Sequence, residues 1–201
     1  MAASVAAIAV AGCAQLGLGG DKAASGGGGW ETLFDGKSLD HFDKVGDANW
    51  RIENGLAVAD KGQGFLLTKK SYKDFTIRAE FWAEADTNSG VFIRCNNRAT
   101  IDSKTCYEFN IWDTRPGQEY STGGIVDTAK VNPPPKAAGK WNTYEITAKG
   151  DQLISVLNGQ KVAEARDGKH SQGPFGLQRF NGNDKTSPIP VKFRKVEIKP
   201  L

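Results

Sequence analysis

The chain has 201 residues, a length that suits one domain with a substantial core. Hydrophobic residues make up 39% and charged residues 24%, which is the composition of a globular protein and excludes a disordered one. The 26 basic and 23 acidic residues leave a net charge of +3 and form no basic stripe, so we expect no nucleic-acid partner.

Residues 1–29 differ in composition from the rest of the chain. Residues 1–12 are an uncharged run of small and apolar residues, shorter than the roughly 20 residues of a membrane span. The run fits the apolar core of an export signal. It ends in VAGC (10–13), which resembles the lipobox of bacterial lipoproteins, where the signal is cleaved before a cysteine that is then acylated. No Lys or Arg precedes the run, and a disordered apolar tail is the alternative.

We therefore expect an export signal over 1–12, a lipid anchor at Cys13 and a flexible Gly/Ala/Ser linker over 13–29. The expected location is exported, either periplasmic or anchored to the outer membrane. Contact with a membrane would then be through the lipid alone. The sequence carries no indication of the oligomeric state.

From Trp30 onward, short runs with β-branched or aromatic residues at period two predict strands separated by Gly, Asn, Asp and Pro. The stretch 145–165 predicts a three-stranded meander, with reversals at Gly150-Asp151 and Asn158-Gly159. About ten strands without a helical run favour an all-β sandwich or jelly roll. The predicted strands cover 50–59, 64–69, 75–84, 90–95, 107–113, 123–127, 141–150, 153–165, 175–180 and 191–199.

The run over 107–113 has two unlike faces. Tyr107, Phe109 and Ile111 form an ordinary core face. The other face carries a carboxylate, an amide and an indole, at Glu108, Asn110 and Trp112. On the curved sheet of a jelly roll, that makeup is typical of a row of side chains that faces a ligand.

Cys95 and Cys106 flank a turn-rich connection between two predicted strands, so a disulfide closing a long hairpin is one possibility. If the two cysteines lie directly opposite each other, Arg94 points to the side of Tyr107 and away from Glu108. A bulge or an offset register would remove that conflict.

A family resemblance is carried by the order and spacing of ten runs over residues 30–201. They resemble the 3-keto-disaccharide hydrolase domain family, although many members have Gln at the position of Asn110 and His near Arg179 and Phe180. The runs are WETLFDGKSLDHF (30–42), WRIENGLAV (50–58), YKDFTIRAEF (72–81), NSGVFIRC (88–95), YEFNIWDTRPG (107–117), TGGIV (122–126), KWNTYEITAKG (140–150), LNGQKV (157–162), GPFGLQ (173–178) and FRKVEIKPL (193–201).

The resemblance implies a concanavalin A-like jelly-roll sandwich of two antiparallel sheets. It also implies an enzyme acting on an oxidised sugar substrate, a glycoside or disaccharide whose ring carries a ketone at carbon 3. Such a ketone acidifies the hydrogen at carbon 2, so a base can remove it and the enolate can expel the substituent at carbon 1. Addition of water completes a hydrolysis. The site needs a base, a donor for the enolate oxygen, an acid and an aromatic platform.

We assign catalytic roles to Glu108, Arg94 and Asp113, where Glu108 is the carboxylate and Arg94 stabilises the anionic intermediate. The structural alternatives are a solvated strand Glu, an ion pair of Arg94 with a carboxylate, and turn initiation by Asp113 before Pro-Gly. For substrate binding we assign Asn110, Trp112 and Gln178, with Trp112 as the stacking platform.

We expect no metal and no cofactor. His41 and His170 lie in turn-rich segments without a metal-ligand spacing. Loop carboxylates such as Asp60, Asp86 and Asp184 could hold Ca²⁺, but no Ca²⁺-loop motif is present.

The alternative function is a non-catalytic carbohydrate-binding module of the same fold, and a third interpretation is a structural envelope protein. An enzyme should place Glu108 beside Arg94 in a cleft with a shifted pKa. A binding module should instead show an open groove with several coplanar aromatic residues. A structural protein should have the Glu108 face covered by another strand or chain.

Overall fold

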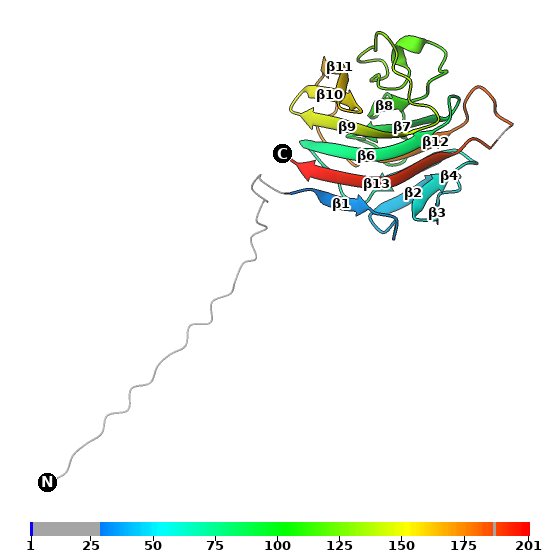
Figure 1. The fold of residues 1–201 in the computed structure, drawn as a ribbon. Helices are drawn as coiled ribbons and strands as arrows, with labels where there is room; N and C mark the ends of the chain where they lie inside the picture. The colour runs from blue at the N-terminus through cyan, green and yellow to red at the C-terminus, as the bar shows by residue number, and fades with distance from the viewer. Residues whose placement is uncertain (2–28, 187) are drawn as a thin grey trace.

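The computed structural model describes residues 1, 29–186 and 188–201. In these ranges the chain forms two antiparallel sheets and contains no α-helix, only the 3-10 turn η1 (Gln118–Tyr120) (Figure 1). The predicted all-β sandwich is confirmed. The expected export signal, Cys13 and almost all of the linker lie outside the described residues. Within the described part of the chain, no helix is long and apolar enough to cross a membrane.

The larger sheet has eight strands, and its central strands follow the period-two pattern closely. Along β6, nine consecutive residues alternate between buried and half-buried. The predicted meander is present as β9, β10 and β11. The order across the sheet is β11 (Gln160–Arg166), β10 (Gln152–Leu157), β9 (Trp141–Lys149), β6 (Phe75–Ala83), β13 (Val191–Pro200), β4 (Leu56–Ala59) and β3 (Arg51–Glu53), with β1 (Glu31–Phe34) also paired to β13.

The smaller sheet has five strands and carries the candidate site on its outer face. Its inner face packs against the larger sheet, for example where the rings of Phe109 and Tyr144 lie 6.4 Å apart. The shared core is apolar and continuous between the sheets. The order across this sheet is β2 (Phe42–Gly46), β5 (Gly64–Thr68), β12 (Gly176–Phe180), β7 (Asn88–Ile93) and β8 (Tyr107–Ile111).

Four sequence expectations about strands need correction. The run 123–127 is not a strand, because Gly123 has a φ of 93° and only Ile125 makes isolated bridges. The run 50–59 is two strands separated by a turn at Asn54-Gly55, where both φ values are positive. The strand predicted from Gly90 begins earlier, at Asn88, and the predicted list lacks β1 and β2.

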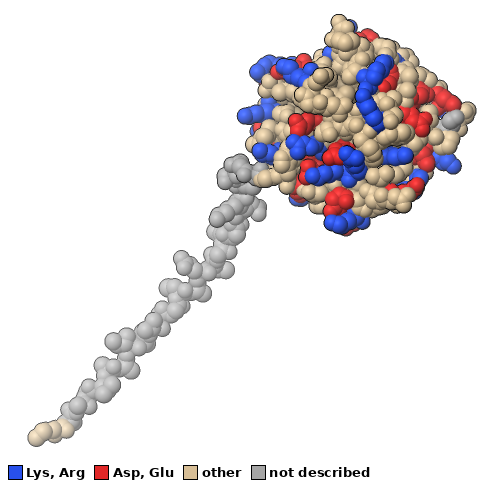
Figure 2. All heavy atoms as spheres, viewed as in Figure 1, with Lys and Arg blue, Asp and Glu red and all other residues tan. Residues whose placement is uncertain are grey.

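Charges of both signs are mixed on the face over the larger sheet, where Figure 2 shows basic and acidic side chains next to one another. Ion pairs join Arg78 to Glu145 and Lys195 to Glu197, at 2.6 and 2.9 Å. This face therefore presents no large single-sign field of the kind that attracts nucleic acid.

A disulfide joins Cys95 to Cys106, whose Cα atoms are 4.2 Å apart. It closes the segment 96–105, which we call the disulfide loop. The loop is also fastened to the smaller sheet by Arg98, which donates hydrogen bonds to the Thr68 carbonyl and to Asp43, at 3.0 and 2.8 Å. The disulfide and these hydrogen bonds therefore hold the disulfide loop against the smaller sheet.

Candidate active site

The outer face of the smaller sheet is built from residues that alternate with the core residues along each strand. On β8, Glu108 lies on this face and pairs across the ladder with Phe92 of β7. On β12, Gln178 lies on the same face and pairs with Gly90 of β7. Three neighbouring strands thus bring a carboxyl, an amide and an aromatic ring to one area of the sheet.

A pocket of about 250 Å³ opens over this area. Of the six residues assigned from the sequence, Glu108, Trp112 and Gln178 line it together. Arg115, which the sequence assignments do not include, also lines it. One side is closed by Ile101, Asp102 and Ser103 of the disulfide loop, and Phe92, Phe180 and Asn88 come from the sheet.

Glu108 is a half-buried carboxyl that makes no hydrogen bond or ion pair with any residue of the described ranges. Burial raises its pKa from 4.5 to about 7, while the charge of Arg115 lowers this pKa and that of Asp127 raises it. At neutral pH the carboxyl is therefore close to half ionised. A group in that condition can both take and return a proton.

Arg115 supplies the positive charge of the pocket. It lies in the turn that follows β8, and its guanidinium donates to the carbonyls of Pro116 and Gly117 at 3.0 and 3.1 Å. Within the part of the chain that the structure describes, no carboxylate pairs with it. Its sequence position, in the Pro-Gly turn directly after the strand predicted over 107–113, places it near that strand but does not predict that its side chain enters the pocket.

Trp112 is held in place through its indole N–H, which donates to Asp86 at 3.1 Å. Asp86 also accepts hydrogen bonds from Thr114 and from the backbone of Asn183 and Asp184. Burial raises the pKa of Asp86, but these hydrogen bonds outweigh burial and lower it to about 2. The indole is therefore one fixed wall of the pocket.

Gln178 is buried, and its side-chain oxygen has no hydrogen-bond partner among the described residues. Opposite it stands Gly90, where an added Cβ would lie 3.0 Å from the carbonyl oxygen of Phe109. A side chain at this position would therefore crowd the Phe109 carbonyl. Because Gln178 lines the pocket, its side-chain amide lies beside the space that a ligand would occupy.

The prediction that Arg94 lies beside Glu108 is wrong. Arg94 has a φ of 51° at the end of β7 and is fully buried on the side of Tyr107, away from Glu108. Its guanidinium donates to the carbonyls of Lys73 and Gly150 at 2.8 and 2.7 Å, and it pairs with Asp74 at 3.0 Å. With Cys95 and Cys106 joined, Arg94 takes the first of the two arrangements considered above and is a structural cation.

Asp113 also lies outside the pocket. It is buried and accepts hydrogen bonds from the Thr122 hydroxyl at 2.6 Å and from the backbone N–H groups of Ala137 and Ala138 at 2.9 Å. These contacts use both carboxylate oxygens to fasten the proline-rich segment 131–140 to the end of β8. The geometry gives Asp113 a structural role.

Asn110 is on the expected face of β8 but is covered. The loop after η1 pairs with the free edge of β8, through hydrogen bonds between Asn110 and the backbone of Gly123 and Gly124. The Asn110 amide donates to the carbonyl of Tyr120 at 2.6 Å, and the residue is 1% exposed. Asn110 therefore supports the wall of the site and does not line the pocket.

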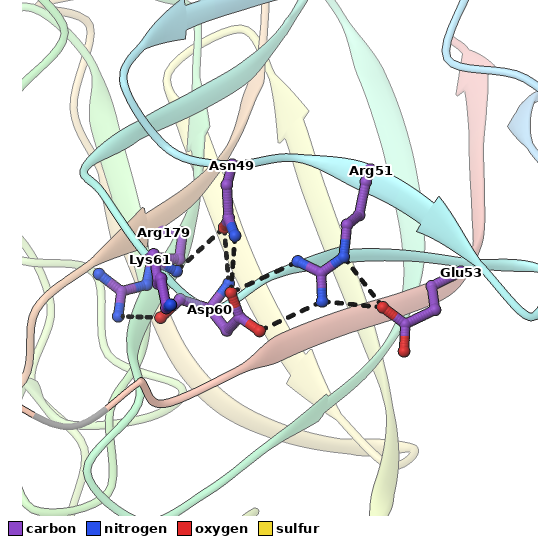
Figure 3. A network of polar contacts seen from close by, with 6 residues as sticks. All are labelled: Asn49, Arg51, Glu53, Asp60, Lys61 and Arg179. Atoms are coloured by element: carbon purple, nitrogen blue, oxygen red, sulfur yellow. Dashed lines mark hydrogen bonds and ion pairs between the residues drawn. The ribbon is translucent and has the colours of Figure 1, made fainter.

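Arg179, in the segment where the resemblance leads one to expect a His, is buried and belongs to a structural network (Figure 3). Its guanidinium donates to the carbonyls of Asp60 and Gly62, at 2.7 and 2.6 Å. The Asp60 carboxylate in turn accepts from Asn49 at 2.7 Å and pairs with Arg51 at 3.2 Å. Asp60, considered above as a loop carboxylate for Ca²⁺, is thus engaged by protein groups.

In the ranges that the structure describes, no group of three or more His, Cys, Asp or Glu side chains is arranged to hold a metal ion. His170 is buried beside the ring of Tyr107, with centroids 4.9 Å apart. Among the described residues that line the pocket, the ionisable side chains are Glu108, Arg115 and Asp102.

Comparison with known proteins identifies the relatives of the chain. The sequence model of the 3-keto-alpha-glucoside-1,2-lyase-like domain family matches residues 29–199. No curated protein matches the sequence.

Solved structures share the fold at low sequence identity. One, from Parabacteroides distasonis and named "putative glycosyl hydrolase", is 20% identical with a TM-score of 0.73, over 86% of this chain and 94% of that one. The carbohydrate binding module CBM66 from Bacillus subtilis is 18% identical with a TM-score of 0.56, over 85% and 95%. A Bacillus subtilis protein with a galectin-like fold is 10% identical with a TM-score of 0.63, over 80% and 90%.

Proposed function

Because the chain belongs to the 3-keto-alpha-glucoside-1,2-lyase-like domain family, we propose that it is an enzyme that cleaves glycosides whose sugar ring carries a ketone at carbon 3. The observation that carries the proposal is the Glu108 carboxyl. It lies in the pocket, has no partner among the described residues, and has a pKa raised to about 7. A strand carboxylate with only a structural role would be solvated or paired, as Glu145 is with Arg78. Glu108 is neither.

The first step of the proposed reaction is proton abstraction. The Glu108 carboxylate takes the proton from carbon 2, and the electron pair of the broken C–H bond forms a double bond between carbons 2 and 3. The ketone oxygen becomes an enolate. Arg115, which lines the same pocket and has no carboxylate partner among the described residues, stabilises this negative charge.

The second step is elimination. The enolate returns its electron pair, the ketone re-forms, a double bond forms between carbons 1 and 2, and the bond from carbon 1 to the leaving-group oxygen breaks. The protonated Glu108 gives its proton to that oxygen. Addition of water across the new double bond then yields the free 3-keto sugar. A carboxyl with a pKa near 7 suits both directions of proton transfer.

Trp112 and Gln178 position the sugar in this proposal. The indole of Trp112 is anchored by Asp86 and offers an apolar surface to the C–H side of the ring. The side-chain amide of Gln178, which lines the pocket, forms a hydrogen bond with a sugar hydroxyl.

The test is product analysis of the full chain with a 3-keto-glucoside that carries deuterium at carbon 2. We expect release of the aglycone, loss of the deuterium to solvent, and a slower reaction than with hydrogen at that position. Glu108→Gln should lower kcat by at least about 100-fold. The matched control is Glu164→Gln, an exposed strand glutamate whose replacement should leave kcat unchanged.

A second candidate function is a carbohydrate-binding module without catalysis, which the likeness to CBM66 favours. It predicts saturable binding of sugar by the wild type with no aglycone release from any 3-keto-glycoside. Turnover with full retention of the deuterium would instead keep an enzyme but reject proton abstraction by Glu108.

A further inference from the structure

A second hollow, the apolar chamber, adjoins the Glu108 pocket on the outer face of the smaller sheet. Its volume is about 250 Å³. Among the described residues that line it, none is charged, and Gln63 provides the only polar side chain. The apolar side chains that line it are Val45, Phe65, Ala99, Ile101 and Phe180.

The chamber and the Glu108 pocket are neighbours, because Ile101 and Phe180 line both. Beneath them, Phe65 contacts Phe180 and Phe92 edge to face, with ring centroids 5.5 and 5.1 Å apart. Phe92 belongs to the floor of the Glu108 pocket. One floor of aromatic rings therefore extends from the carboxyl to the chamber.

The spacing between the two hollows fits a sugar and its substituent. Glu108 lies on β8 and Phe65 on β5, three strands away in the sheet order. At about 4.8 Å per strand this is roughly 14 Å across the sheet, and the register places Phe65 level with Asn110, two residues along from Glu108, so the two residues are roughly 16 Å apart. A group on carbon 1 of a sugar at Glu108 would first meet Ile101 and Phe180, which line both hollows.

The wall over both hollows is formed before any ligand binds. It is the disulfide loop, closed by Cys95–Cys106 and fastened to the sheet by Arg98. Ala99 and Ile101 of this loop face the chamber, and Asp102 and Ser103 face the Glu108 pocket. A preformed wall lowers the entropy cost of binding.

We propose that the apolar chamber binds the leaving group of the substrate, and that this leaving group is an aryl or alkyl aglycone. The inference rests on the proposed function. Among the described residues that line this space only Gln63 has a polar side chain, so a second sugar would gain few hydrogen bonds from side chains there. An aromatic or alkyl group instead buries apolar surface against Phe65 and Phe180.

The test compares benzyl and methyl 3-keto-glucosides, because the two alcohols are leaving groups of nearly equal acidity. With the full chain we expect kcat/KM to be larger for the benzyl compound by roughly tenfold or more. Ala99→Trp fills the chamber from an exposed loop position and should remove that preference while leaving kcat/KM for the methyl compound unchanged. The control is Thr100→Trp, which adds the same bulk at the next, exposed position outside the chamber and should keep the preference.

The outcomes separate the two proposals. If both glucosides are cleaved at equal kcat/KM, or if Ala99→Trp lowers both equally, the aglycone assignment fails and the enzyme remains. Faster cleavage of a 3-keto disaccharide than of the benzyl compound would also overturn the assignment. If no glucoside is cleaved, the proposed function fails, and tighter binding of the benzyl than of the methyl compound, abolished by Ala99→Trp, would still support the chamber as an apolar site.

Discussion

Replacing Glu108 by Gln should stabilise the protein in alkaline solution and leave its stability unchanged in acid. The folded protein holds the Glu108 proton more tightly than the unfolded chain does, because burial raises the pKa from 4.5 to about 7. The sign follows from linkage: this contribution to stability is complete below pH 4.5 and is lost as the pH rises through 7. Above that pH, the wild type carries an ionised carboxylate in a site that favours the neutral form.

The magnitude follows from the two pKa values. Their difference corresponds to about 3 kcal/mol for a fully enclosed group. Because the side chain is half-buried and solvent screens it in part, we take about 2 kcal/mol as the gain on neutralising it. For a domain of this size, that gain raises Tm by roughly 4–8 °C.

The assay is thermal unfolding of wild type and Glu108→Gln, followed by circular dichroism at about pH 4 and pH 8.5. The control is again Glu164→Gln, because that carboxylate is paired with Lys161 and Gln152, which lower its pKa. The control variant should gain nothing at the higher pH. A loss of stability of Glu108→Gln at pH 8.5, or the same difference at both pH values, would refute the view of Glu108 as an unpaired and desolvated carboxyl.

Two further predictions concern residues around the site. Arg94→Met should lower the free energy of unfolding by about 3–5 kcal/mol in urea titrations, because it leaves Asp74 and three carbonyls without their buried donor. KM of the folded fraction should not change, and full stability with lost activity would return Arg94 to the catalytic group. The low pKa of Asp86 contributes stability above pH 3.8 that is lost as the pH falls through about 2, so Asp86→Asn should remove about 1 kcal/mol of acid dependence. Acid unfolding followed by Trp fluorescence measures this, and an identical acid slope in variant and wild type would contradict it.

The parts of the fold that depend on local patterns could be predicted from the sequence. Side-chain alternation along a strand is a local property, so it correctly placed Glu108 on the outer face of β8 and Trp112, directly after β8, in the same pocket. The meander of β9 to β11 follows from two turn signals that act over a few residues.

The rest of the site depends on backbone conformation and on long-range packing. Arg94 itself has a left-handed backbone conformation at the end of β7, which turns its side chain away from Glu108. No alternation pattern indicates such a conformation. Asn110 has the predicted orientation, yet the loop after η1 covers it through contacts with the edge of β8. Arg115 enters the pocket because of the conformation of the turn after β8, which side-chain alternation along a strand does not predict.

The position of β13 has a consequence for how the protein is made. This strand, Val191–Pro200, lies between β6 and β4 in the sheet and also pairs with β1. Its partner β6 ends at Ala83, so the two neighbouring strands are far apart in the sequence. At about 5–20 residues per second, the ribosome needs roughly 5–25 s to synthesise the chain between the two partners. Throughout that interval one edge of β6 is open to pairing with other chains.

A nascent chain released before residue 191 would lose the centre of the sheet rather than its margin. The strands β9 to β11 would stay attached to β6, but β1 and the β3–β4 hairpin would have no sheet to join. Incomplete products should therefore fail to fold and be open to proteolysis, so that completion of the chain acts as a checkpoint for its folding.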